Sequence, residues 1–320
     1  MRILRFLLLL TVSWSGVEAQ KRIVFSFDDV PRGAGAFFTP DERTDALIKA
    51  LREGGVKQAG FFVTTGNLEK PDGAGGEHRI AKYVAAGHVI GNHSQSHLWL
   101  NRTSVEDYIA DLDKASRWLE KRPGYRPWYR YPFLDEGRRD LAKRDALRSA
   151  LRQRGLSNAY VTIDNYDWHM ESLASGACRE GKRMDMKALR DLYVETLVGT
   201  ANFYERMAVE TLGRSPAHVI LLHETDVAAL FIDDLAKALR KDGWRIVPID
   251  EAYRDPIAAE EPDTWFLGEG RVAALAQIKG ADPRDLVYER TDEAVLSRLF
   301  ASRVISDKAP PCRARDTGKL

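Results

Sequence analysis

Short runs of β-branched and aromatic residues alternate along this chain with longer segments of helical periodicity. The alternation is typical of parallel strands joined by crossover helices, because parallel neighbours need a long connection. Seven strands are expected, at residues 22–27, 59–64, 88–92, 128–130, 159–164, 218–223 and 245–249. Six helices are expected between them, at residues 40–53, 77–86, 105–121, 141–154, 186–212 and 227–242.

The number of these elements constrains the architecture. Seven strands with six intervening helices favour a closed or nearly closed α/β barrel, and a doubly wound open sheet is the competing arrangement. Glycine stands directly after most of the helical segments, as expected where a helix ends.

The two ends of the chain differ from this alternating region. Residues 1–19 combine a basic start, an apolar stretch and a small-residue pattern ending at Ala19, which predicts a signal peptide. The apolar stretch is shorter than the roughly 20 residues that span a bilayer. We therefore expect an exported protein, periplasmic or secreted, with a barrel over residues 20–255. Residues 256–320 are expected to form a C-terminal helical extension and a polar tail.

Charge and cysteine content narrow the range of partners. Lys and Arg number 48 against 47 Asp and Glu, so nothing in the net charge of +1 favours nucleic acid as a partner. No later segment predicts stable membrane insertion once the signal peptide is removed. Cys178 and Cys312 would enter a compartment that permits disulfides. A bridge between them and two free thiols both stay open, because the sequence does not give their separation.

Polar residues stand at the carboxyl ends of most predicted strands. In a barrel of parallel strands the active site forms at these ends, so side chains from different strands are expected to meet there. The residues concerned are Asp28, Asp29, His93, Arg130, Asp164 and His223.

Two of these strand ends suggest a metal site. His93 and His97 are four residues apart, so both imidazoles reach one side if the chain turns helically after the strand. A hydrolytic zinc site takes about three protein ligands and leaves a position for water. One carboxylate of the Asp28-Asp29 pair could be the third ligand while the other faces the water. Each motif alone arises often by chance, but together they predict one divalent metal, zinc first and Co, Ni or Mn as alternatives.

Five segments resemble, in order and approximate spacing, the motifs of the polysaccharide deacetylase family, also called the NodB-homology or carbohydrate esterase 4 family. These segments are residues 27–29, 93–97, 130–133, 164–168 and 221–223. The resemblance covers residues 22–253 and implies a distorted (β/α)7 barrel. It also implies a hydrolase that removes acetyl groups from N-acetylated amino sugars of chitooligosaccharide, peptidoglycan or exopolysaccharide.

The resemblance implies a role for each residue of the first motifs. Asp28 would be the general base, and Asp29, His93 and His97 would bind the metal. Arg130 would orient Asp28 and keep it ionised.

The later motifs supply the acid and the substrate pocket in the same way. His223 would be the general acid, oriented by Asp164. Trp168 and Leu221 would line a small apolar pocket for the acetyl methyl, and the backbone N–H of Phe133 would help to bind the oxyanion.

The sequence departs from the family pattern directly after the paired aspartates. Family members usually have glycine there, whereas this chain has Val30-Pro31. A β-branched residue disfavours positive φ, so the loop is expected to leave the strand differently and to change the shape of the groove.

Two other functions compete with glycan deacetylation. The first is metal-dependent hydrolysis on the same scaffold, but with non-sugar amides, including cyclic amides, as substrates. The second is a catalytically silent carbohydrate-binding protein on the same fold. The presence of both Asp28 and His223 favours an enzyme over the silent protein.

Overall fold

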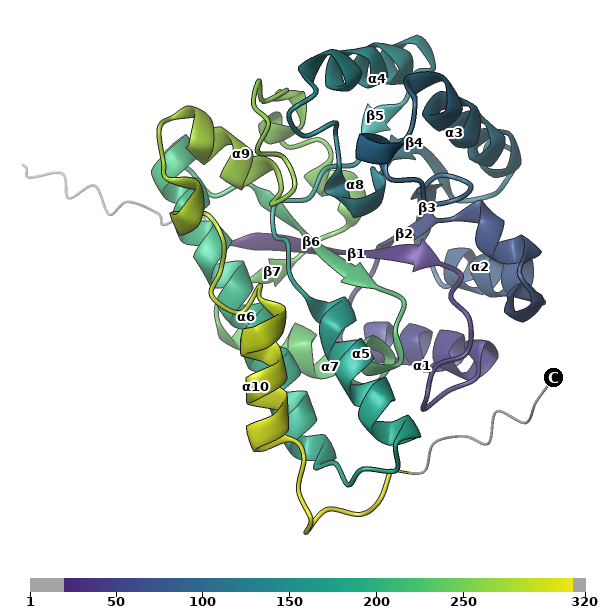
Figure 1. Ribbon diagram of the computed structural model, residues 1–320, viewed down its shortest axis with the longest axis vertical. Helices are drawn as coiled ribbons and strands as arrows, with labels where there is room; N and C mark the ends of the chain where they lie inside the picture. The colour runs from purple at the N-terminus through teal and green to yellow at the C-terminus, as the bar shows by residue number, and fades with distance from the viewer. Residues whose placement is uncertain (1–19, 313–320) are drawn as a thin grey trace, which may run out of the picture.

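The computed structural model describes residues 20–312, and its centre is one seven-stranded sheet (Figure 1). The strands follow the order β5-β4-β3-β2-β1-β6, with β7 paired to β1, and every pair is parallel. The strands are β1 Arg22–Val30, β2 Gly60–Val63, β3 Val89–Asn92, β4 Tyr125–Tyr129, β5 Ser157–Asn158, β6 Ala217–His223 and β7 Arg245–Ile246.

The sheet curls round because the segment after β5 reaches β6. Ile163 forms a parallel bridge with Ile220, and the backbone N–H of Leu221 donates to the carbonyl of Ile163. Strand β5 has only two residues. The apolar run expected as a strand at residues 159–164 follows it, and this run forms its hydrogen bonds with β6. The fold is therefore the expected distorted α/β barrel.

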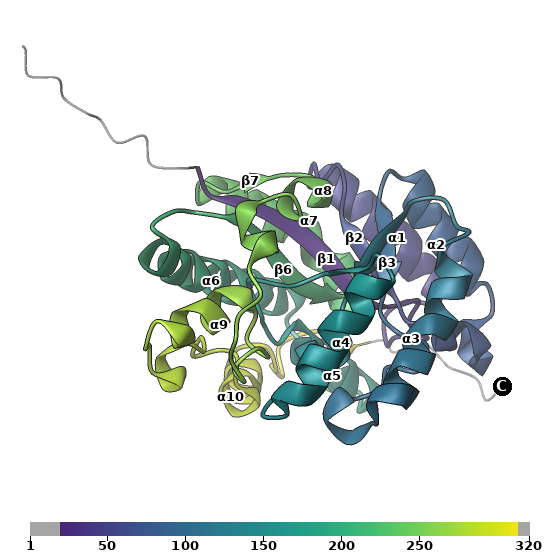
Figure 2. The same ribbon diagram turned by 90° about the horizontal axis from the view of Figure 1, so that it is seen from above.

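Helices connect the strands and pack around the sheet (Figures 1 and 2). The helices expected over 40–53 and 186–212 have those bounds, and the other four expected helices agree to within two residues. The longer helices of the barrel are α1 Pro40–Glu53, α2 Gly76–Ala85, α3 Val105–Leu119, α4 Leu141–Gln153, α5 Asp167–Arg179, α6 Met186–Leu212 and α7 Asp226–Lys241.

Helix α1 shows how the local sequence fixes an element. Thr39 and Glu42 form a reciprocal capping box, and Pro40 occupies the first turn, where its missing N–H costs nothing. Leu47 and Leu51 are fully buried on one face of the helix. The start of α1 therefore fixes the end of the loop that leaves β1.

The C-terminal extension shares the core of the barrel. Short helix α8 (Ile249–Ala252) precedes it, and it contains α9 (Arg271–Ile278) and α10 (Glu293–Arg303). Helix α9 packs on α6, and α10 packs on α5 and α6 (Figure 2). Side chains from both helices belong to the same buried cluster as the strands.

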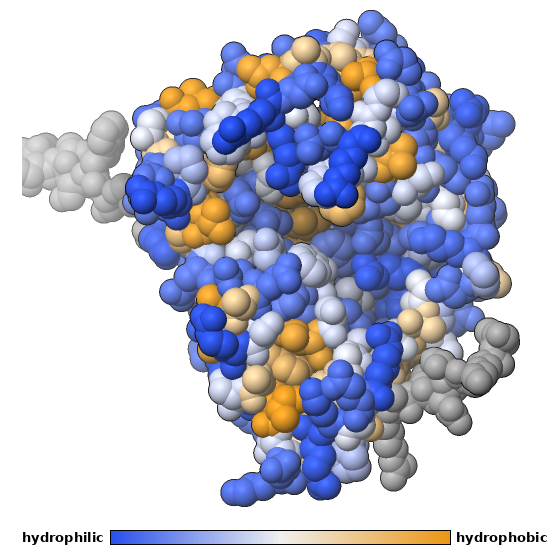
Figure 3. Space-filling model, viewed as in Figure 1, coloured by the Kyte–Doolittle hydropathy of each residue, from blue (hydrophilic) through white to orange (hydrophobic). Residues whose placement is uncertain are grey.

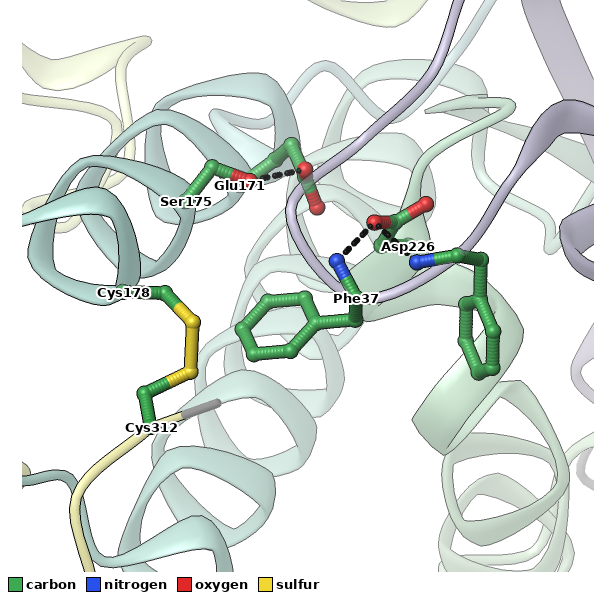
Figure 4. Close-up of a disulfide and its surroundings, with 7 residues drawn as sticks. Phe37, Glu171, Ser175, Cys178, Asp226 and Cys312 are labelled. Carbon is green, nitrogen blue, oxygen red and sulfur yellow. Dashed lines mark hydrogen bonds between the residues drawn. A yellow bond between two sulfur atoms is a disulfide. The ribbon is translucent and has the colours of Figure 1, made fainter. Parts of the chain in front are cut away.

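A disulfide joins Cys178 of α5 to Cys312, with the two Cα atoms 5.1 Å apart (Figure 4). Beside it the backbone N–H of Cys312 donates to the carbonyl of Lys182, and Arg183 bridges to Pro311. The end of the described chain is thus attached to the region that follows α5.

The expected signal peptide, residues 1–19, and the last part of the polar tail, residues 313–320, lie outside the described residues. None of the helices within residues 20–312 combines the length and apolar character needed to cross a membrane.

Candidate active site

A bulge in β1 brings the adjacent aspartates to one site. Phe27 pairs with Phe61 and Val30 with Val63, so one more residue lies between the paired positions on β1 than on β2. Such a bulge re-aims side chains at the end of a strand. Asp29 adopts a φ of 66°, which is uncommon for a residue other than glycine. The left-handed residue is therefore Asp29, while Val30 stays paired in the strand.

Asp29, His93 and His97 form a cluster with metal-ligand geometry. Asp29 Oδ1 lies 3.6 Å from His93 Nε2 and 3.2 Å from His97 Nε2. One donor atom from each residue lies within 4.8 Å of the others. Donors bound about 2.0–2.2 Å from one tetrahedral ion would be roughly 3.3–3.6 Å apart. The three side chains therefore fit a single divalent cation.

Hydrogen bonds, burial and nearby charges favour the forms of these side chains that can bind a cation. His93 Nδ1 lies 2.8 Å from the carbonyl oxygen of Arg130, so it can donate there and leave Nε2 free to bind. Burial and the neighbouring His93 lower the pKa of His97 to about 4, which keeps this ring neutral at pH 7. Burial opposes ionisation of Asp29, but His223, His97 and Arg32 nevertheless hold the pKa of its carboxyl well below the usual range.

Asp28 lies beside this cluster and is held by Arg130. Arg130 Nη1 donates to both carboxylate oxygens, at 2.9 and 3.1 Å, and both side chains are buried. The other guanidinium nitrogens donate to Ser26 Oγ, Tyr253 Oη and the carbonyl of Ala159. Asp28 Oδ2 lies 3.7 Å from His93 Nε2. This carboxylate therefore lies next to the position that the metal ligands surround.

Strand register places His223 beside Asp28 at the same site. His223 of β6 pairs with Asp28 of β1. Its Nδ1 lies 2.7 Å from Asp167 Oδ1, and its backbone N–H donates to the other oxygen of Asp167. Burial disfavours the charged ring, but the buried Asp167 carboxylate outweighs it and raises the pKa of His223 to about 9. His223 is consequently protonated at pH 7, with Nε2 available to the site.

The expected contact between Asp164 and His223 is wrong, because Asp167 makes it. Asp167 is the first residue of α5, and its backbone N–H donates to Asn165 Oδ1 as the chain turns from strand to helix. This turn directs the Asp167 carboxylate toward β6. Burial and the neighbouring Glu269 instead raise the pKa of Asp164 well above its usual range. The sequence did contain the signal, since Asp167 belongs to the same motif.

The three residues expected to contact substrate lie at different depths. Leu221 is 7% exposed and lies two residues before His223, on the same side of β6. Trp168 is 37% and Phe133 52% exposed. The Phe133 ring packs edge-on against His97, with centroids 4.5 Å apart. Phe133 therefore borders the ligand cluster directly, and its φ of 59° marks a sharp turn there.

The loop after β1 is held by acidic residues that the sequence did not single out. Arg32 Nη1 donates to Asp29 Oδ2 at 2.8 Å, and its backbone N–H donates to Glu224 at 2.7 Å. Asp226 accepts the N–H groups of Phe37 and Phe38 (Figure 4). Glu224 and Asp226 lie one and three residues after His223, so the end of β6 and the start of α7 supply both a site residue and the anchors of the loop.

The site opens to solvent beside this loop. A hollow of about 280 Å³ has Asp29, His97, Arg32, Asn67 and Lys70 in its lining. The face shown in Figure 3 is also hollowed near its middle, where hydrophobic atoms lie at the floor and hydrophilic side chains around it. A ligand can therefore reach the ligand cluster from outside.

Comparison with known protein families finds one match. A family model described as polysaccharide deacetylase matches residues 15–157, which include β1 to β4 and the ligand cluster. The match covers just under half of the chain, which is similar to the polysaccharide deacetylase family over this part.

Several curated proteins are similar in sequence. A peptidoglycan-N-acetylglucosamine deacetylase of Bacillus cereus is 32% identical over 126 residues, 39% of this chain and 40% of that protein. Peptidoglycan-N-acetylglucosamine deacetylase PgdA of Listeria monocytogenes is 20% identical over 75% of this chain and 40% of its own length. A chitin deacetylase of Colletotrichum lindemuthianum is 24% identical over 76% of this chain and 82% of its own. The chain thus spans less than half the length of the two bacterial relatives.

Solved structures are similar as well. A family 4 carbohydrate esterase from Streptomyces lividans has 20% identity and a TM-score of 0.48, over 74% of this chain and 97% of that chain. Peptidoglycan deacetylase PdaC from Bacillus subtilis has 21% identity and a TM-score of 0.45, over 73% and 90%.

Proposed function

We propose that this chain is a metal-dependent hydrolase that removes acetyl groups from N-acetylated amino sugars of a glycan. The observation that carries the proposal is the cluster of Asp29, His93 and His97 beside a buried carboxylate, with a histidine that is itself paired with a carboxylate on the neighbouring strand. The match to the polysaccharide deacetylase family model supports it, as do relatives named as peptidoglycan and chitin deacetylases.

One divalent cation would be held by Asp29, His93 and His97, with zinc as the first candidate and Co, Ni or Mn as alternatives. When bound, such a cation polarises an acyl oxygen and makes a water molecule more acidic. Arg32, which holds the second oxygen of Asp29, would fix the orientation of this ligand.

Asp28 would act as the general base. Arg130 donates to both of its oxygens, so the position of this carboxyl group is fixed. A water molecule beside the ligand cluster would then lie within hydrogen-bond reach of this carboxylate, which would accept its proton during attack on the acetyl carbon.

His223 would act as the general acid. The departing sugar amine is a poor leaving group and needs a proton. The ring is protonated at pH 7 because Asp167 stabilises its charge, so Nε2 carries the proton that the amine would take. Asp28 and His223 are paired positions on neighbouring strands, so the base and the acid would both lie next to the reacting bond.

Apolar side chains would receive the acetyl methyl. Leu221 and Trp168 would line this pocket, and the backbone N–H of Phe133 would stabilise negative charge on the acyl oxygen. The position of Phe133 against His97 supports that assignment.

The acetylated glycan would be met outside the cytoplasm. The signal-peptide pattern of residues 1–19 supports export to the periplasm or the medium. A glycan of the cell wall or the surroundings is then the accessible substrate.

Acetate release tests the proposal. Purified protein should release acetate from N-acetylglucosamine oligomers or peptidoglycan fragments, lose activity with a chelator and regain it with Zn²⁺ or Co²⁺. Cyclic and linear non-sugar amides serve as control substrates. Turnover of those amides alone would replace the sugar assignment, and glycan binding without any acetate release would indicate a silent binding protein.

A further inference from the structure

A larger hollow, of about 670 Å³, adjoins the candidate active site at Phe133. One wall is the loop from Phe133 to Asp140, which follows β4. The other wall is residues 265–269 of the C-terminal extension, outside the part of the chain matched by the family model. Because the Phe133 ring also contacts His97, this hollow lies next to the cluster of metal ligands. We call it the extension groove.

Exposed aromatic rings occur in both walls. Phe133 is 52% and Trp265 42% exposed, although burial of such a side chain is favourable. Trp265 and Arg139 also line a neighbouring hollow of about 490 Å³, so the surface continues past the groove. Aromatic faces exposed among polar groups suit a ligand with an apolar face and polar edges, as a sugar ring has.

Two arginines in the same loop lack carboxylate partners. The guanidinium groups of Arg138 and Arg139 lie 5.3 Å from the ring centroids of Trp99 and Trp265 respectively. Among residues 20–312, no carboxylate lies within 4.0 Å of either guanidinium. These cations are therefore available to a ligand.

The acidic residues in the same lining have other partners. Asp135 accepts the backbone N–H groups of Asn101 and Gly137, and Glu136 pairs with Arg148 at 3.1 Å. Asp140 caps the start of α4. Burial raises the pKa of Glu269, the remaining carboxyl of the lining, and outweighs the nearby charge of Arg138, which acts to lower it. The charge that the groove offers to a ligand is thus mainly positive.

We propose that the extension groove binds the sugar residues next to the one that is deacetylated, and that it favours a glycan bearing carboxylates. Trp265 stacks on one sugar ring, and Arg138 and Arg139 bind the acidic groups. This inference rests on the proposed function. In this inference the C-terminal extension selects the glycan, and the barrel carries the residues that catalyse deacetylation.

The stacking is tested by the dependence of acetate release on chain length. For the wild-type protein, kcat/KM should rise from N-acetylglucosamine monomer to tetramer. Trp265→Ala should lower kcat/KM for the tetramer about tenfold and leave kcat/KM for the monomer unchanged. Val209→Ala removes an exposed side chain from α6 and is the matched control, with no expected effect. An unchanged length dependence in Trp265→Ala would overturn the stacking.

The charge preference is tested with the Arg138→Gln/Arg139→Gln variant. Oligomers containing N-acetylmuramic acid carry carboxylates, whereas chitooligomers are neutral. The variant should lose binding of the acidic oligomer by about tenfold or more, and the loss should shrink at high salt. Equal losses for both oligomers would contradict the preference for carboxylates.

Binding measurements test this inference separately from the proposed function. Titration calorimetry with both oligomers needs no turnover, so it reports on the groove even if acetate is never released. Weaker binding to Trp265→Ala than to Val209→Ala supports the groove in that case. Acetate release with equal binding by both variants would refute the groove and leave the deacetylase intact.

Discussion

At the scale of single residues, the two adjacent aspartates have different surroundings. Asp28 is buried and bonded by Arg130, whereas Asp29 faces two imidazoles and is bonded by Arg32. The bulge and the positive φ at Asp29 create this difference, because neighbouring residues of a regular strand point to opposite faces. The two carboxylates are therefore expected to respond differently to substitution.

Substitution of Asp28 should separate chemistry from metal binding. Asp28→Asn should retain one equivalent of zinc but lose activity by about 10²–10⁴-fold, the usual contribution of a general base. His93→Ala should lose the metal, because it removes one of three ligands. Metal content by mass spectrometry and acetate release check both expectations. Equal metal content in the two variants would refute the assignment of ligands.

Substitution of Asp167 should change the pH dependence. The pKa of His223 is raised to about 9, so the acid is present below that pH and activity should fall as pH rises through it. Asp167→Asn removes the charge that raises the pKa, so the alkaline limb should move to lower pH by at least about one unit. The check is the pH profile of kcat.

Asp164→Asn is the matched control for this shift. The carboxyl of Asp164 has a raised pKa and makes no hydrogen bond to His223 in the described part of the chain, so an amide should leave the alkaline limb in place. A shift in Asp164→Asn with none in Asp167→Asn would restore the role expected from the sequence.

At the scale of elements, the loop between β1 and α1 connects the site to the rest of the barrel. Its backbone is bonded by Glu224 and Asp226, which directly follow the end of β6. Asp226 also pairs with the buried Arg43 of α1 at 3.3 Å. Two strand ends and one helix therefore fix the segment that carries Arg32.

Glycine substitutions in two elements should have opposite effects. A Cβ at Gly35 would lie 1.9 Å from Asp226 Oδ2, so Gly35→Ala should displace the loop and lower both activity and melting temperature. Gly176, inside α5, has nothing within 4 Å of an added Cβ. Gly176→Ala should stabilise by about 0.5–1 kcal/mol. Thermal unfolding and acetate release measure both, and equal behaviour of the variants would contradict the packing around Asp226.

At the scale of the whole molecule, the helices and strands that could be predicted from the sequence are those with a clear periodic pattern or a local end signal. The helix over 40–53 has a capping box and a following glycine, so its bounds could be predicted. Helix α5 was missed because its Ser-, Gly- and Ala-rich sequence has no clear apolar period. The strand ends predicted which residues meet, but the choice between Asp164 and Asp167 depends on how the chain turns into α5.

The pairing of Cys178 and Cys312 also lay beyond the sequence, since it depends on where the chain returns after the barrel. The disulfide closes a separation of 134 residues, and such a crosslink restricts the unfolded chain. We expect Cys178→Ser/Cys312→Ser to lose about 2–4 kcal/mol of unfolding free energy.

The same substitution should lower stability without removing the metal site. Asp167 begins α5 and Cys178 lies near its end, while α10 packs on α5 and α6 from the extension. Loss of the bridge should leave metal content unchanged, because the three ligands lie on β1 and after β3. Chemical denaturation measures the stability, and addition of a reductant to the wild-type protein should reproduce the loss. An unchanged midpoint in both experiments would show that packing of the extension, rather than the disulfide, holds the end of the chain on the barrel.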